Sequence, residues 1–464
     1  MSDAVAEVRL LPPQLADVLE SVEGSARDLG VEMYLVGGFV RDRLLGTLGK
    51  DIDLVSVDGD GMQVLGAVAR AFGWAPPQQF ERFGTAQIRG DGFILESVRA
   101  RAERYDPESR KPTVKPGTLQ QDVMRRDFTV NALCQTFDGR VIDITARGLD
   151  DLRAGVLRTP LDAAETFAED PLRMFRAARF RAQLGFDLAP GMLDAMRQQA
   201  ERASILSVER ISEELRRLLI SAHPREGMLV LRDSGLLERV MPEVAAMIGV
   251  EQGGYHVYDV FDHTMHALDR SPRDLITRCA VLLHDAGKPP THAVIDGKHT
   301  FYDHPRVGAD MAREMLTRLR FSNDEADAVS QLVRLHLRPI QYDEATFSDA
   351  AVRRLIRDAG DLRTRMLDVA RADTEASSYP DTHNIDSLQR RMAALDQGRQ
   401  LSELRDPLSG DEIMARYRKG PGPWVRDIKN ALRDAILDGE IPPSDAPAAR
   451  RWLDDHPQVG DGCI

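Results

Sequence analysis

The chain has 464 residues, enough for roughly three domains of ordinary size, and 42% of its residues are hydrophobic, so it can bury several cores. Its formal net charge of −13 argues against a surface that is basic throughout, so a nucleic-acid-binding surface must be a local patch on an acidic body. Three scattered cysteines without a CxxC pair and no apolar run long enough to span a membrane indicate a soluble cytoplasmic protein with reduced thiols.

The N-terminal region has the pattern of strands alternating with helices. Apolar residues at helical spacing predict a helix over Leu15 to Leu29. Met33 to Val36 is typical of a strand, Gly37 and Gly38 of a tight turn, and Phe39 to Leu45 of the start of a helix. Because backbone N–H groups at such a turn attract anions, the sequence predicts a phosphate site here.

An acidic strand follows this helix. In Lys50 to Val55 the side chains alternate, so Asp51 and Asp53 project from one face while the residues between them point to the core. Two carboxylates on one face can bind a metal ion, and Arg41 offers a guanidinium that can fork onto phosphate oxygens.

Together, GGFVRDRLLG at residues 37–46 and DID at residues 51–53 resemble the signature of the class II nucleotidyltransferases of the polymerase β superfamily. This is the group of the bacterial CCA-adding enzymes and poly(A) polymerases. The resemblance implies a polymerase β-type head in which Gly38 and Arg41 contact the nucleotide triphosphate. It also implies that Asp51 and Asp53 are catalytic and hold two magnesium ions.

The rest of this region predicts a helix and a hairpin. Gln63 to Phe72 has helical spacing, and Ala86 to Ile88 and Phe93 to Val98 are strand-like around a glycine turn. Glu96 could project toward the acidic pair as a third carboxylate, as in related polymerases. An exposed strand glutamate is the simpler interpretation.

A polar segment, Arg99 to Thr118, contains three prolines and no periodicity, which predicts a surface loop. In the CCA-adding family a flexible loop at this position is needed to switch from adding C to adding A. Family members that add only the two Cs have a shortened loop. The full length of the segment here favours the complete activity.

Residues 124–133, MRRDFTVNAL, resemble the second motif of the same family. The resemblance places Arg126 at the triphosphate and Asp127 at the ribose 2′-hydroxyl, the group that separates ribonucleotides from deoxyribonucleotides. A helix-capping Asp behind two surface arginines is the structural alternative, and Asn131 could equally be a structural amide.

From about residue 162 the pattern is helical. In Glu169 to Phe180, Asp170, Arg173, Arg176 and Arg179 recur every third residue, which predicts one ridge on a helix. An Asp that accepts from an exocyclic amino group and an Arg that donates to a ring nitrogen would accept cytosine and adenine and reject uracil and guanine. The segment resembles the nucleotide-selecting EDxxR motif of the family. The resemblance assigns base selection to Asp170 and Arg173, and phosphate contacts to Arg176 and Arg179. A surface ion pair is the alternative.

A second group of histidines and acids begins near Tyr255 and resembles the HD superfamily of metal-dependent phosphohydrolases. Imidazole and carboxylate ligands suit a divalent metal such as Mg, Mn, Ni or Co and leave a position for an activated water. The residues assigned as ligands are His263, His284, Asp285 and Asp373, with His304 and His336 as further candidates. Some CCA-adding enzymes carry such a domain and show phosphatase and cyclic phosphodiesterase activity, whereas others keep it only to hold tRNA.

The sequence therefore predicts an α+β fold: a head with a mixed sheet and helices, followed by all-helical parts. We expect a nucleotidyltransferase head over residues 1–155, a helical neck over 156–250, an HD-type domain over 251–378 and a helical, tRNA-binding tail over 379–464. Within the neck, Val208 to Glu214 resembles the last helix motif of the family, to which a structural role is assigned.

The implied activity is template-independent addition of CCA to the 3′ end of tRNA, with CTP and ATP as substrates and no membrane partner. Addition of CC only, of A only, or of poly(A) would use the same catalytic residues. Two alternatives belong to other classes, namely an HD phosphohydrolase whose head positions RNA, and an RNA-binding protein without catalysis. The sequence leaves the oligomeric state open.

Overall fold

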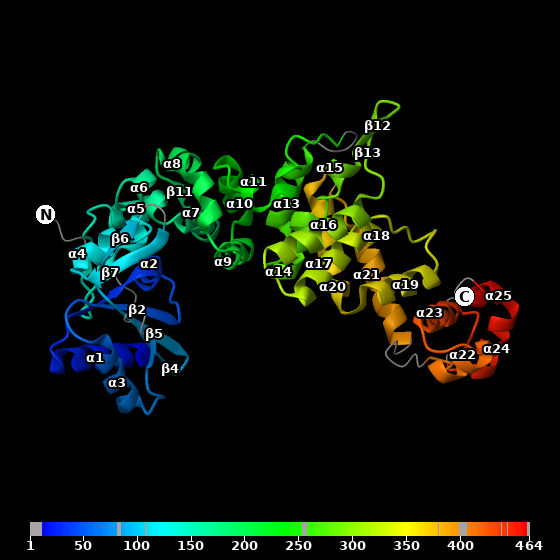
Figure 1. The fold of residues 1–464 in the computed structure, drawn as a ribbon, viewed down its shortest axis with the longest axis horizontal. Helices are drawn as coiled ribbons and strands as arrows, with labels where there is room; N and C mark the ends of the chain where they lie inside the picture. Colours follow the sequence, from blue (N-terminus) through cyan, green and yellow to red (C-terminus); the bar gives the residue numbers. More distant parts are fainter. Residues whose placement is uncertain are drawn as a thin grey trace. The chain divides into compact units, whose positions relative to one another are not determined.

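In the computed structural model the chain forms two compact units, Met1–Pro242 (unit 1) and Glu243–Ile464 (unit 2) (Figure 1). The structure describes residues 12–80, 85–106, 109–252, 258–378, 380–398, 406–437, 439–442 and 444–461. Within these ranges, no helix combines the length and the apolar character that crossing a bilayer requires.

Unit 1 begins with a mixed sheet of seven strands in the order β3-β4-β5-β2-β1-β8-β9. Strands β2 and β5 run parallel, and the other neighbours are antiparallel. The strands are β1 Met33–Val36, β2 Asp51–Ser56, β3 Gln78–Phe80, β4 Thr85–Gly90, β5 Phe93–Arg99, β8 Cys134–Gln135 and β9 Val141–Ile142. This confirms the predicted mixed sheet.

Two helices that lie side by side pack on this sheet, α1 (Pro13–Asp28) and α3 (Gly61–Phe72) (Figure 1). Helix α1 buries Leu15, Leu19 and Val22, whose spacing of three and four residues places them on one helical face. Helix α3 ends where Gly73 adopts a left-handed conformation. Both helices confirm the periodicity in the sequence.

Two segments differ from their predictions. Instead of a turn at Gly37 and Gly38, helix α2 (Gly37–Leu44) begins at the first glycine, directly after β1. Instead of an irregular loop, residues 99–118 contain the antiparallel strands β6 (Arg101–Asp106) and β7 (Ser109–Pro116), with residues 107 and 108 outside the described ranges. Prolines argue against a strand, but a two-stranded hairpin has two edges, where proline is tolerated.

The remainder of unit 1 is mostly helical, as predicted. Its helices are α4 Leu119–Met124, α5 Gly148–Ala154, α6 Ala163–Glu169, α7 Leu172–Leu184, α8 Met192–Gln199, α9 Val208–Leu219, α10 Pro224–Asp233 and α11 Leu237–Val240, with 3₁₀ turns η2 Thr129–Asn131 and η3 Ala200–Ile205. A short parallel pair, β10 (Val156–Leu157) and β11 (Asp187–Leu188), joins the segment after α5 to the segment after α7.

Unit 2 is also mostly helical, with one small hairpin of β12 (Ala293–Ile295) and β13 (Lys298–Thr300). Its longer helices are α13 Val260–Arg270, α14 Leu275–Leu283, α16 His304–Arg318, α17 Asn323–Leu335, α19 Asp349–Ala359, α20 Arg363–Ala376 and α21 His383–Gly398. Its short helices are α15 Lys288–Thr291 and α18 Leu337–Ile340, and α12 (Pro242–Ala245) contains the boundary between the units.

The C-terminal helices of unit 2 are α22 Gly410–Tyr417, α23 Pro423–Leu437, α24 Ala446–Asp455 and α25 Pro457–Asp461. They share a core that includes Trp424, Ile428, Leu432 and Leu453. Ser409 and Glu412 close a capping box at the start of α22, which satisfies backbone donors that would otherwise lack partners. The α+β head and the helical remainder thus confirm the predicted fold class.

Candidate active sites

The acidic pair lies on β2, in the middle of the sheet. Ile52 and Leu54 are fully buried on one side, whereas Asp51 and Asp53 share the opposite, less buried side. The parallel register of β2 and β5 places Glu96 directly beside Asp53, so three carboxylates meet on one face of the sheet. This placement supports the interpretation of Glu96 as a third acid.

The environment of Asp53 indicates that this face accepts positive charge. Burial, together with the neighbouring carboxylates Glu96 and Asp51, raises the pKa of Asp53 to about 6, although Arg126 and Arg41 oppose the rise. Burial and neighbouring acids disfavour the ionised form of this carboxyl group, so a nearby cation would stabilise that form strongly. The donor set of three carboxylates is one that magnesium prefers.

The junction of β1 and α2 lies against this acidic face. Gly37 has a φ of +70°, and a Cβ there would lie only 3.1 Å from Asp53 Oδ2 and 3.3 Å from Arg126 Nη1. Arg126 Nη2 donates to Asp122 Oδ2 at 3.0 Å. Sequence reasoning assigned a role to Gly38, but it is Gly37 that allows the backbone to approach the carboxylate.

The two glycines are expected to respond differently to substitution. Gly37→Ala should destabilise the protein by about 1 to 2 kcal/mol, because a left-handed conformation strains any residue with a Cβ. Gly38→Ala should be neutral or stabilising by up to about 1 kcal/mol, because Gly38 is helical and a Cβ there would meet nothing closer than 3.5 Å. Urea unfolding of both variants compares them, and equal losses would contradict this account.

Arg41 and Asn131 join α2 to the segment of the second motif. Arg41 Nη1 donates to Asn131 Oδ1, and Arg41 Nε donates to Asp42 Oδ1 at 2.8 Å. The Arg41 guanidinium also lies 5.1 Å from the centre of the Phe180 ring on α7. Asn131 is therefore a positioning residue for Arg41, a role that the sequence left open.

Asp127 is the most connected acid of this site. Its Oδ1 accepts from the Phe128 N–H at 2.8 Å and from Asn131 Nδ2 at 3.1 Å. Its Oδ2 accepts from Arg176 Nε at 2.8 Å and from Nη2 at 2.5 Å. Although burial opposes ionisation, Arg176 and these hydrogen bonds outweigh it and hold the pKa of Asp127 at about 2. Two predicted site residues, 49 positions apart, are thus in direct contact.

This depressed pKa predicts a pH-dependent contribution to stability. The contribution is fully present above the unfolded-state pKa of about 3.9 and is lost as the pH falls through about 2. The loss of unfolding free energy in Asp127→Asn should therefore be about 2 kcal/mol larger near pH 6 than near pH 2. Denaturant unfolding across this range tests the expectation, with the exposed Asp150→Asn as control. A pH-independent difference would contradict it.

The nucleotide-selecting segment differs from its prediction in one respect. Asp170 does not lie on the same helix as the arginines, because α6 ends at Glu169, with Asp170 as its C-cap, and α7 begins at Leu172. Asp170 Oδ1 instead accepts from the Leu172 N–H at 3.1 Å. A proline at position 171 suits the start of a new helix and interrupts the old one, which the simple three-residue spacing did not reveal.

Arg173 and Arg179 are both buried and already bonded. Arg173 Nη2 donates to the carbonyl of Arg125 at 2.5 Å, and its Nη1 donates to that of Thr166 at 3.3 Å. Arg179 Nε donates to Glu214 on α9 at 2.5 Å. In this structure Arg173 therefore connects α7 to the second-motif segment, and Arg179 connects α7 to α9.

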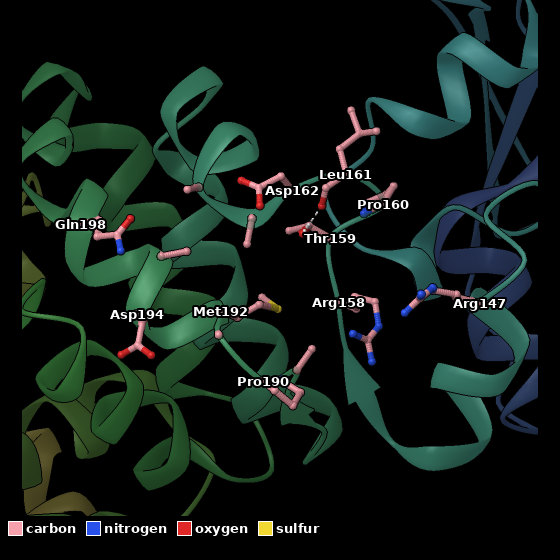
Figure 2. A pocket seen from close by; sticks show the side chains of 15 residues that line it. Arg147, Arg158, Thr159, Pro160, Leu161, Asp162, Pro190, Met192, Asp194 and Gln198 are labelled. Atoms are coloured by element: carbon pink, nitrogen blue, oxygen red, sulfur yellow. Dashed lines mark hydrogen bonds between the residues drawn. The ribbon is translucent and has the colours of Figure 1, made fainter.

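A pocket of about 560 Å³ in unit 1 is separate from these residues (Figure 2). Arg147 and Arg158 line one side, and Asp162 and Asp194 line the other. None of the predicted site residues is among those that line it. Asp162 Oδ1 caps α6 by accepting from the Glu165 N–H.

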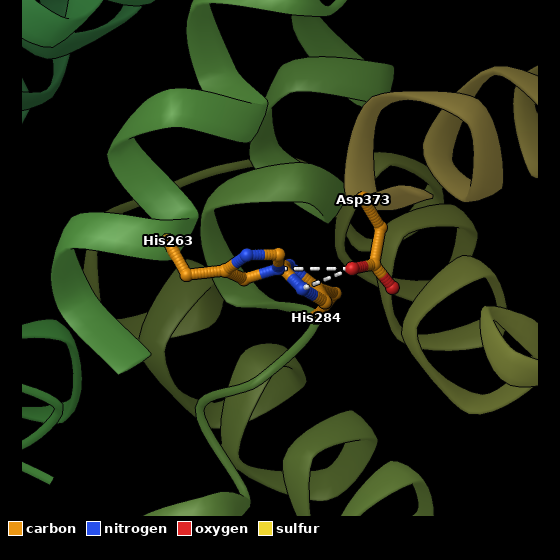
Figure 3. Close-up of side chains that lie close together, drawn as sticks. All are labelled: His263, His284 and Asp373. Atoms are coloured by element: carbon orange, nitrogen blue, oxygen red, sulfur yellow. Dashed lines mark hydrogen bonds and ion pairs between the residues drawn. The ribbon is translucent and has the colours of Figure 1, made fainter. Parts of the chain in front are cut away.

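In unit 2 the structure brings together all six predicted HD residues. They form two groups, each compact enough to hold one metal ion. The first group is His263, His284 and Asp373, and the second group is Asp285, His304 and His336. Figure 3 shows the first group, in which His263 Nε2 lies 2.9 Å and His284 Nε2 3.7 Å from Asp373 Oδ1.

Asp285 lies between the two groups. Its Oδ2 is 3.2 Å from His284 Nε2, and its Oδ1 is 3.5 Å from His304 Nε2 and 3.9 Å from His336 Nε2. Lys288 Nζ also lies 2.7 Å from Oδ2, a contact that the sequence interpretation did not include. His284 and Lys288 hold the pKa of Asp285 well below its usual range in spite of burial, so the carboxylate is ionised.

Three of the histidines are oriented by backbone carbonyls. Nδ1 of His284, His304 and His336 lies 2.7, 2.9 and 2.6 Å from the carbonyls of residues three positions earlier. An Nδ1–H that donates there leaves the Nε2 lone pair facing the cluster, the arrangement that metal-binding histidines use. Burial lowers the pKa of His336 to about 4, which keeps its imidazole neutral. The geometry therefore fits divalent metal binding.

Three segments match known protein families. Residues 33–158 match the poly A polymerase head domain, residues 185–248 the probable RNA and SrmB-binding site of polymerase A, and residues 253–378 the HD domain. The Bacillus stearothermophilus CCA-adding enzyme in complex with CTP has a similar fold, with a TM-score of 0.68 and 23% identity over 98% of this chain and all of that one. The Thermotoga maritima CCA-adding enzyme complexed with tRNA has a TM-score of 0.59 and 17% identity, with 98% of each chain covered.

Two curated relatives are more similar in sequence. The A-adding tRNA nucleotidyltransferase of Deinococcus radiodurans is 34% identical over 444 residues, which cover 91% of this chain and 96% of that protein. The multifunctional CCA protein of Chromobacterium violaceum is 35% identical over 384 residues, which cover 78% of this chain and 90% of that one. On this similarity over nearly its whole length, the chain is an enzyme of the tRNA nucleotidyltransferase and poly(A) polymerase family.

Proposed function

We propose that this protein adds C, C and A in turn to the 3′ end of tRNA, using CTP and ATP without a nucleic-acid template. The observation that carries the proposal is the face of β2, where Asp51, Asp53 and Glu96 meet beside Gly37. The names of the two relatives, an A-adding tRNA nucleotidyltransferase and a multifunctional CCA protein, support tRNA as the substrate. Since tRNA, CTP and ATP are cytoplasmic, the reaction implies a cytoplasmic enzyme.

Asp51 and Asp53 would hold two magnesium ions, which supply activation of the tRNA 3′-hydroxyl and charge neutralisation at the α-phosphate. Arg126 and Arg41 would hold the triphosphate, with the backbone at Gly37 and Gly38 close to it. The reaction forms a phosphodiester bond to the 3′-oxygen and releases pyrophosphate. Asp127 would accept a hydrogen bond from the ribose 2′-hydroxyl.

Selection of the base would fall to Asp170 and Arg173. Cytosine and adenine both present an amino donor beside a ring-nitrogen acceptor, which an Asp and an Arg complement. In the structure Arg173 already donates to two backbone carbonyls, so contact with a base requires exchange of one of these bonds. We also propose four domains with separate roles: a head over residues 1–155, a neck over 156–250, an HD-type domain over 251–378 and a tRNA-binding tail over 379–464.

Addition of the terminal A alone is the second candidate activity, because a relative that matches 91% of this chain is named for it. A gel that resolves single nucleotides separates the two. It would use tRNAs ending before CCA, after C and after CC, each with magnesium and CTP, ATP or both. Growth by three residues from the shortest tRNA supports full CCA addition, and growth only from the CC end supports A addition.

Other outcomes of the same gel would overturn the assignment. Arrest after two residues means a CC-adding enzyme, and a long ladder with ATP means a poly(A) polymerase. If no tRNA is extended, the main activity is that of the HD-type site, or the protein only binds RNA.

We further propose that the HD-type site holds two divalent ions and hydrolyses phosphate esters. Its six ligands form two groups with Asp285 between them, an arrangement suited to a shared, bridging carboxylate. Mixed imidazole and carboxylate ligands suit Mn, Ni, Co or Mg. Such a pair of ions would supply a nucleophilic water and neutralise the phosphoryl oxygens.

A further inference from the structure

The guanidinium of Arg176 lies between two carboxylates from different elements. Its Nε and Nη2 donate to Asp127 Oδ2, and its Nη1 lies 3.9 Å from Glu214 Oε1 on α9. The other oxygen of Glu214 accepts from Arg179 Nε at 2.5 Å. Arg176 thus has one bonded partner and a second carboxylate just beyond hydrogen-bond distance.

Asp127 has no acceptor position left. A carboxylate offers about four lone-pair sites. The Phe128 N–H and Asn131 Nδ2 use the two on Oδ1, and Arg176 uses the two on Oδ2. The proposed function requires Asp127 to accept from a ribose 2′-hydroxyl. That hydroxyl can bind only if one of the present donors leaves, and the backbone N–H is fixed in the fold.

We propose that Glu214 is a positioning residue that receives Arg176 when a ribose 2′-hydroxyl binds Asp127. The exchange rests on the proposed role of Asp127 in ribose binding. Arg176 turns from Asp127 Oδ2 toward Glu214 Oε1, and the hydroxyl donates to the freed position on Oδ2. Because Arg176 keeps a carboxylate partner throughout, no buried charge is left unpaired, which would otherwise be costly.

The surroundings of Glu214 suit this role. Glu214 is only 6% exposed and is held by Arg179, whose guanidinium lies 4.0 Å from the centre of the Phe180 ring and donates to Gln183 at 2.8 Å. The receiving carboxylate is therefore fixed in place. The Arg176 side chain, in contrast, is 33% exposed, which leaves it room to turn.

The exchange predicts a specific effect on sugar selection. A 2′-deoxynucleotide has no hydroxyl to replace Arg176 on Asp127, so the arginine stays where it is. If the charge of Glu214 is removed, Arg176 has no second carboxylate to pair with after it leaves Asp127. Its movement away from Asp127 then becomes unfavourable. Ribonucleotides would then bind more weakly, whereas 2′-deoxynucleotides would be unaffected.

The test is Glu214→Gln, which keeps the size of the side chain, assayed with CTP, ATP, dCTP and dATP in single-nucleotide addition to tRNA. We expect KM for the ribonucleotides to rise about tenfold while the constants for the deoxynucleotides change less than about twofold. Glu213→Gln is the matched control, because Glu213 is the preceding residue but is exposed and pairs with Arg217. Its preference for ribose should equal that of the wild type.

Equal losses with both kinds of sugar would show a merely structural role for Glu214 and overturn the proposal, as would an unchanged ribose preference. Glu214→Asp, which keeps the charge, provides a second check in case the Gln variant does not fold. This variant should keep most of the ribose preference even if its overall activity falls. A ribose preference that falls as much as the overall activity would contradict the exchange. A wild-type protein that adds no nucleotide would refute the proposed function itself, and one that does not discriminate between the sugars would refute the proposed role of Asp127 in ribose binding.

Discussion

Replacing Asp53 with Asn is expected to abolish nucleotide addition to tRNA while leaving the fold intact. Asp53 is partly buried, whereas Asp51 is exposed, and it lies beside Glu96 on the neighbouring strand. Loss of a carboxylate that holds the metal ions removes several kcal/mol of transition-state stabilisation, so turnover should fall by at least roughly 10³-fold. Steady-state addition of labelled nucleotide to tRNA measures the effect.

The same substitution should raise stability in the absence of metal, which separates a chemical defect from misfolding. The raised pKa of Asp53 means that its charge is disfavoured in the folded protein, so a neutral amide of the same shape should increase the melting temperature. Asp58→Asn, at an exposed position shortly after β2, is the control and should keep full activity. Retained activity in Asp53→Asn would refute the catalytic assignment, and a lower melting temperature would refute the electrostatic one.

Replacing Asp285 with Asn is expected to have the second largest effect, on the HD-type site alone. Because Asp285 faces ligands of both groups, its loss should reduce the bound divalent metal from about two ions per chain to one or none. Hydrolysis of phosphate monoesters and of cyclic phosphodiesters should fall by at least roughly 10²-fold. Nucleotide addition to tRNA should be unchanged, because the acidic face belongs to unit 1.

Metal content after equilibration with Mn, Ni or Co, measured by mass spectrometry, tests the first part, and a phosphatase assay tests the second. Asp296→Asn is the control, because Asp296 lies in the turn of the β12–β13 hairpin with a φ of 51°, a conformation that Asn accepts. Hydrolysis that survives in Asp285→Asn would show that the site assignment is wrong. A loss of nucleotide addition in this variant would instead show that the two activities are not separable.

Much of the head could be predicted because its signals are local. Alternation along β2 places Asp51 and Asp53 on one side of the strand, and helical spacing in Leu15 to Leu29 identifies the first helix almost to its ends. The six HD residues could be named because the histidines and acids of that region resemble the pattern of the HD superfamily. The first two inferences need only the period of a strand or helix, whereas this one rests on the resemblance.

Local signals failed where a proline or a strand edge overrode periodicity. The spacing of Asp170 and Arg173 suggested one helix, but Pro171 divides the segment into α6 and α7. The prolines between Arg99 and Thr118 suggested a loop, but the chain forms a hairpin whose edges tolerate them. In both cases the conformation differs from the prediction.

The sequence by itself predicted the fold class and led us to propose which residues carry the chemistry of the two sites. Only the tertiary structure decided how these residues pair. Asp127 meets Arg176 across 49 positions, and His263 meets Asp373 across 110. The position of Asp285 between two groups of ligands and that of Arg176 between two carboxylates likewise depend on how helices pack. No period in the sequence encodes such contacts, because they arise when distant segments bury their apolar faces together and bring their polar groups into reach.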